Sequence, residues 1–181
     1  STSMAKLLGI SCSSATACTA VGFRGTSNRD PVAERWNGTS WSLQTTVEPT
    51  PTSAFTGISC PSSTSCVAVG NEGTGLLVER WNGIVWAAES APKPAGATST
   101  ELLGVSCPST SACVAVGSYK TAEGNEYSLV ETWNGVAWSV GTPPSPAGAT
   151  SNALTSVSCV SPTICVAAGR SGSVTLVERS S

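Results

Sequence analysis

The chain of 181 residues repeats two short patterns at intervals of about fifty residues. The first pattern is a pair of cysteines separated by five residues; the first cysteines, at positions 12, 60, 107 and 159, lie 48, 47 and 52 residues apart. The second pattern, W-N-G-x-x-W, begins at positions 36, 81 and 133. A fixed period of about 20–50 residues is typical of stacked or radially arranged units. We therefore divide a single repeat domain, 1–181, into units at about 6–53, 54–100, 101–152 and 153–181, the last of them incomplete.

Each unit contains its own cysteine pair, and a recurring unit is expected to close its own bridge. The residues around the pairs resemble short strands, and those between them form turns, so the cysteines should face each other across a hairpin. Zinc sites usually have two cysteines separated by two to four residues, together with additional cysteine or histidine ligands. The cysteines of each pair here are separated by five residues and the chain has no histidine, so we expect neither metal nor cofactor. Four disulfides predict a secreted protein. The expected pairs are Cys12–Cys18, Cys60–Cys66, Cys107–Cys113 and Cys159–Cys165.

The second pattern also predicts a hairpin. Asn-Gly is a strong turn signal, and it places the two tryptophans of each pattern opposite each other on neighbouring strands. Each full unit then has four antiparallel strands, and extra residues at Ser118 to Tyr127 should lengthen a loop of the third unit. Repeated four-stranded units of this length predict an all-β β-propeller. A β-trefoil, with three such units, is the alternative.

The string ERWNGTSW resembles a degenerate Asp-box, the S-x-D-x-G-x-T-W motif of sialidase-type propeller blades. Gly38 and Trp41 match its glycine and tryptophan, whereas Glu34 and Trp36 replace its serine and aspartate. The whole unit also resembles repeats of secreted actinobacterial proteins. In the Asp-box family the motif is a structural turn remote from any active site, so the resemblance implies a blade and no catalysis.

The incomplete fourth unit leaves closure open. The chain could form a four-bladed propeller with a three-stranded last blade, a fragment of a larger propeller, or an assembly closed by another copy. An unpaired strand edge invites pairing with a neighbour. Self-association through the fourth unit is therefore an expected interaction.

Composition disfavours several classes of function. A net charge of −2 with 11% charged residues disfavours nucleic acid as a partner, and no apolar run reaches the ~20 residues of a membrane span. Catalytic triads with histidine are impossible. The recurring Glu34, Glu79, Glu131 and Glu178 are expected to pair with basic neighbours or to cap turns. We therefore predict no enzymatic activity, with a glycan-acting hydrolase as an alternative.

The repeated aromatic residues favour a binding module. Tryptophan beside polar side chains can stack on the apolar face of a sugar while amides meet its hydroxyls. Several equivalent weak sites would give a multivalent, lectin-like protein that binds carbohydrate or cell-surface glycans. A structural, adhesive or protein-binding repeat, in which the tryptophans only pack between units, is the alternative. The predicted ligand-binding residues are Trp41, Trp86, Trp138, Asn37, Asn82 and Asn134.

Overall fold

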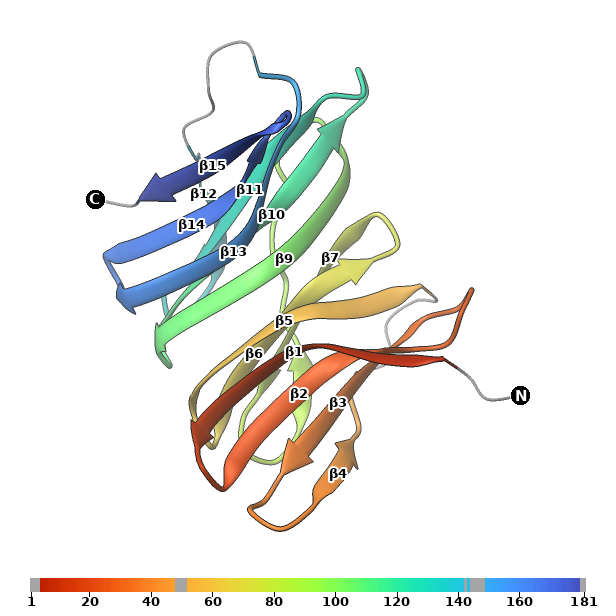
Figure 1. The fold of residues 1–181 in the computed structure, drawn as a ribbon, viewed down its shortest axis with the longest axis vertical. Helices are drawn as coiled ribbons and strands as arrows, with labels where there is room; N and C mark the ends of the chain where they lie inside the picture. The colour runs from red at the N-terminus through yellow and green to blue at the C-terminus, as the bar shows by residue number, and fades with distance from the viewer. Residues whose placement is uncertain (1–3, 48–51, 142, 144–148, 180–181) are drawn as a thin grey trace.

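The computed structural model describes residues 4–47, 52–141, 143 and 149–179 and shows an all-β protein (Figure 1). The first sheet contains β1 (Ala5–Ser14), β2 (Ala17–Arg24), β3 (Asp30–Trp36) and β4 (Trp41–Gln44). The second contains β5 (Ser53–Ser62), β6 (Ser65–Glu72), β7 (Gly75–Trp81) and β8 (Trp86–Ala88). The third contains β9 (Ala97–Ser109), β10 (Ala112–Thr121), β11 (Glu126–Trp133) and β12 (Trp138–Gly141). The fourth contains β13 (Asn152–Ser161), β14 (Ile164–Ser171) and β15 (Val174–Arg179).

Each sheet is an antiparallel meander in which consecutive strands pair in chain order. The prediction of four strands in each of the first three units is confirmed. The β-trefoil alternative does not fit, because the residues from Asn152 onward form a fourth sheet. Among the described residues, no helix is long and apolar enough to cross a membrane.

The first hairpin of every unit is closed by its own disulfide, as predicted. The turn is shorter than the five residues between the cysteines, however. In the first unit the strands continue past the bridge until Ser14 pairs with Ala17, with an irregularity in the register after Cys12. The disulfide therefore joins two paired strands and does not close a free loop.

The insertion in the third unit also differs from the expectation of a longer loop. It extends β10 and β11 instead, so that Tyr119 pairs with Tyr127 and Lys120 with Glu126. The reason is local, because branched and aromatic residues flank the short turn Ala122 to Asn125 and favour paired strands.

The sheets pack face to face in chain order, with the first strands β1, β5, β9 and β13 in contact in succession. We call the side of a sheet that faces the preceding sheet its front face and the opposite side its back face. Between the first two sheets, Val21 and Ala33 of one back face pack against Phe55 and Trp86 of the next front face. The same contact recurs between the next two sheets, where Val67, Val69 and Val78 meet Leu102 and Trp138. Figure 1 shows the first and fourth sheets at opposite ends of this series.

Glycines bring the first strands close together. A Cβ atom on Gly9 would lie 3.2 Å from the Cα atom of Gly57, and one on Gly57 would lie 3.3 Å from that of Gly104. Each contact is accompanied by a hydrogen bond between sheets, from the backbone N–H of Cys60 to the Ser11 hydroxyl oxygen at 2.9 Å and from that of Cys107 to the Ser59 oxygen at 3.0 Å. One interface is thus repeated along the chain.

Candidate functional site

The three predicted asparagines hold the W-N-G turns. The Oδ1 atom of Asn82 accepts hydrogen bonds from the backbone N–H groups of Ile84 and Val85 at 2.9 and 3.0 Å. Asn37 and Asn134 make the equivalent pairs of bonds. The following glycines have φ near +95°, the left-handed region that glycine adopts without strain. These amide oxygens are therefore already occupied within their turns.

The paired tryptophans contact each other across neighbouring strands, with ring centroids 5.7–5.8 Å apart in all three units. Trp86 and Trp138 are each only 5% exposed, because the preceding sheet covers them. Their indole N–H groups donate to side chains of the preceding unit, Trp86 to Gln44 of β4 at 3.0 Å and Trp138 to Glu89, which directly follows β8, at 2.7 Å. A sugar could stack on these two rings only if neighbouring sheets moved apart.

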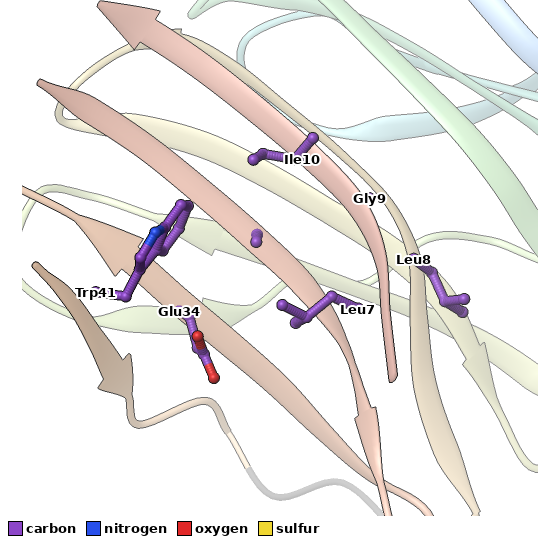
Figure 2. A pocket seen from close by; sticks show the side chains of 7 residues that line it. Leu7, Leu8, Gly9, Ile10, Glu34 and Trp41 are labelled. Carbon is purple, nitrogen blue, oxygen red and sulfur yellow. The ribbon is translucent and has the colours of Figure 1, made fainter. Parts of the chain in front are cut away.

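Trp41 differs from its equivalents because no sheet formed by the described residues packs on the front face of the first sheet. It is 43% exposed and lines an open hollow of about 420 Å³. Figure 2 shows its ring on the same side of the sheet as Leu7, Ile10 and Glu34. The lining is mostly apolar, and its only carboxyl group is that of Glu34. Ligand binding by Trp41 and the other five residues stays a prediction, and Trp41 is the tryptophan among them with an open ring face.

The recurring glutamates do not form the expected ion pairs in the described structure. Glu79 and Glu131 are completely buried on the front faces of the second and third sheets. One carboxyl oxygen of Glu79 accepts from the Val47 backbone N–H at 3.1 Å, while neither oxygen of Glu131 has a partner among the described residues. Desolvation by burial raises the pKa of each carboxyl to about 7. A glycosidase needs two carboxyl groups in one accessible pocket, whereas these two lie under different sheets.

An acidic residue near the end of the hairpin of β10 and β11 also has partners within the protein. Glu126 accepts a hydrogen bond from the Ser118 hydroxyl at 3.1 Å and forms an ion pair with Arg170 of the fourth sheet. No group of histidine, cysteine, aspartate or glutamate side chains that could hold a metal occurs within residues 4–47, 52–141, 143 and 149–179.

A second open hollow lies on the front face of the third sheet. Tyr119 and Tyr127 form its aromatic wall, with ring centroids 5.5 Å apart and planes inclined by 35°. Lys93 and Pro94, from the segment between the second and third sheets, line it together with Ser128 and the end of β12. It encloses about 420 Å³ and combines aromatic rings, hydroxyl groups and an ammonium group.

Sequence reasoning missed this tyrosine pair, although a signal was present. The only two tyrosines of the chain stand at the ends of the segment YKTAEGNEY. A turn at its centre places them opposite each other on two strands. The pair occurs once because only the third unit has the insertion.

Comparison with known proteins gives a likeness of fold. No protein family and no curated protein matches the sequence. A solved structure, described as the SapL1 lectin in complex with alpha methyl fucoside, superposes with a TM-score of 0.52 at 11% identity. The match covers 96% of this chain and 63% of that one, so the chain spans less than two thirds of the lectin's length.

Proposed function

We propose that this chain is an extracellular carbohydrate-binding module without enzymatic activity, and that its sheets are blades of a β-propeller. The likeness of fold to a lectin solved with a fucoside supports a sugar as the ligand. The four disulfides support an oxidising, extracellular environment. The face-to-face packing of four-stranded antiparallel sheets supports the propeller.

The observation that carries this proposal is the hollow beside Tyr119 and Tyr127. Aromatic side chains offer a flat apolar surface with a polar end, which suits the apolar face and the hydroxyl groups of a sugar ring. Lys93 lines the same hollow, and its ammonium group and the tyrosine hydroxyl groups can bind sugar oxygens. The hollow is about 420 Å³, within the range of about 300–1,000 Å³ for small-molecule sites.

This location predicts one site per chain, where the sequence predicts several equivalent tryptophan sites. The tyrosine pair exists only in the third unit, and the rings of Trp86 and Trp138 are covered by neighbouring sheets. Stoichiometry therefore separates a single site from several equivalent tryptophan sites, and variants of Tyr127 and Trp41 separate the two open hollows.

The test is a glycan array on the purified protein, which includes α-methyl fucoside, followed by calorimetric titration of the best ligand. We expect saturable binding of one ligand per chain, with affinity reduced at least about tenfold in Tyr127→Ala because a stacking surface is lost. Tyr127→Phe should keep most of the affinity, since it keeps the ring. Thermal unfolding of each variant shows that the fold is intact.

Trp41→Ala is the control for the other open aromatic ring and should bind as the wild type does. Loss of binding in Trp41→Ala with Tyr127→Ala unaffected would move the site to the first sheet. The absence of saturable binding across neutral and acidic glycans would contradict the proposed function and leave a structural or protein-binding repeat.

A further inference from the structure

The two ends of the series each leave a sheet face uncovered. On the front face of the first sheet, Leu7 and Ile10 are 50% and 61% exposed. They stand at the same strand positions as Phe55 and Ile58 of the second sheet, which are 0% and 8% exposed. The first sheet therefore presents to solvent a surface that the rest of the chain buries.

The back face of the fourth sheet is uncovered in the same way. Val177 is 68% exposed, whereas Val78, its equivalent on β7, is 2% exposed because the third sheet covers it. Val166 is also exposed, although its equivalent Val67 is completely buried. Valines at both positions match a back face that packs against a following sheet.

We propose that the front face of the first sheet of one chain docks on the back face of the fourth sheet of a second copy. The occupant follows from the interfaces inside the chain, where a front face packs on a back face at each of three junctions. The two open faces are the remaining front face and the remaining back face of that same contact. In the docked pair, Leu7, Ile10 and Trp41 of one copy cover Val166 and Val177 of the other.

The hydrogen bonds between sheets also continue across this contact. Inside the chain, the Ser11, Ser59 and Ser106 hydroxyl oxygens accept from the backbone N–H groups of the next unit's first cysteine at 2.9–3.0 Å. Ser158 stands at the equivalent position of the fourth unit and is exposed. Docking would place it beside the backbone N–H of Cys12 of the second copy.

One residue weakens the fit and provides a sharp test. Gly9, Gly57 and Gly104 approach the next unit so closely that a Cβ atom would lie 3.2–3.3 Å from its backbone. Ser156 replaces glycine at this position in the fourth unit, so a docked first sheet must lie a few tenths of an ångström farther away. Ser156→Gly should therefore tighten the association several-fold.

A front-to-back contact is heterologous, so it forms rings or open chains of copies. Two copies would bring eight sheets together, within the range of about four to eight blades in propellers. The experiment is light scattering after size exclusion over a range of protein concentrations. We expect a mass of at least twice the 18.2 kDa of one chain at high concentration.

Ile10→Glu and Val177→Glu each place a charge on one exposed end face, and either variant alone should be monomeric. A mixture of the two should associate again, because each variant keeps the face that the other has lost. Ile84→Glu, in the exposed turn of the second unit, is the matched control and should associate as the wild type does. Association that survives Val177→Glu would overturn the proposal, since a contact between two front faces does not need Val177.

A wild-type chain that stays monomeric at every concentration would also overturn the proposal that these two faces dock on each other. The proposal stands apart from carbohydrate binding, because Tyr119 and Tyr127 lie on the front face of the third sheet. Monomeric Ile10→Glu should bind sugar as the wild type does, so the two proposals fail separately.

Discussion

The unfolding free energy of the wild type should fall as the pH rises from 5 to 8.5. Replacing Glu79 with glutamine should make this fall smaller. Glu79 is completely buried on β7, where one carboxyl oxygen accepts from the Val47 backbone N–H and the other has no partner among the described residues. Desolvation raises the pKa of this carboxyl from 4.5 to about 7, and the hydrogen bond from Val47 opposes part of that effect. The folded state therefore holds the proton more tightly than the unfolded state does.

The sign of the effect follows from that difference. The stabilising contribution of this group is complete below about pH 4.5 and is lost as the pH rises through about 7. A pKa raised from 4.5 to about 7 corresponds to about 3 kcal/mol. Because part of this contribution is already lost at pH 5, just above the unfolded pKa of 4.5, about 2 kcal/mol of it is lost between pH 5 and pH 8.5. Glutamine has the same shape and does not titrate.

The assay is chemical unfolding at pH 5 and pH 8.5, followed by tryptophan fluorescence with the disulfides intact. Between these values, the wild type should lose about 2 kcal/mol more unfolding free energy than Glu79→Gln. Glu34→Gln is the matched control, since Glu34 holds the same strand position on the first sheet, where no described sheet covers it; at concentrations where the chain is monomeric we compare its effect with that of Glu79→Gln. An identical pH dependence in Glu79→Gln and the wild type would refute the reasoning.

Five further substitutions test the repeated interface and its turns by thermal and chemical unfolding. Trp86→Ala should cost about 3–5 kcal/mol because its ring fills the contact between two sheets, whereas Trp41→Ala in the monomer should cost less than about 1 kcal/mol; equal costs would contradict the difference in burial. Gly70→Ala should cost at least about 3 kcal/mol, since its Cβ atom would lie 1.9 Å from the Ala54 carbonyl oxygen. Gly73→Ala, with φ +57° and open space around it, should cost only about 1 kcal/mol, and a reversed order would contradict the geometry. Asn82→Ala should cost about 1 kcal/mol through its two lost turn hydrogen bonds, and an unchanged stability would show that the turn does not need them.

The hairpins and their bridges could be predicted from the sequence because they depend on short spacings. Two strands with a turn between them place Cys60 opposite Cys66, and Asn-Gly places Trp81 opposite Trp86, whatever the rest of the chain does. Local chemistry is sufficient for this level of structure, and the repetition made the assignment of four bridges simple.

The exposure of each repeated residue could not be predicted in the same way. Trp41 and Trp86 have the same local sequence context and the same partner across the strand pair, yet one is open and the other buried. The difference comes from the sheet that precedes each unit, which is a property of the position in the series. The burial of Glu79 and Glu131 could not be predicted for the same reason. The neighbouring arginine or threonine in the sequence does not indicate which sheet covers the carboxyl group.

The most direct measurement of this account is hydroxyl-radical footprinting of the tryptophans, read by mass spectrometry on the monomeric protein. One front-to-back contact, repeated along the chain, covers Trp86 and Trp138 and leaves Trp41 open. We therefore expect rapid oxidation of Trp41 and slow oxidation of Trp86 and Trp138 in the folded chain. Equal oxidation rates for the three residues, or a protected Trp41 in the monomer, would contradict this expectation.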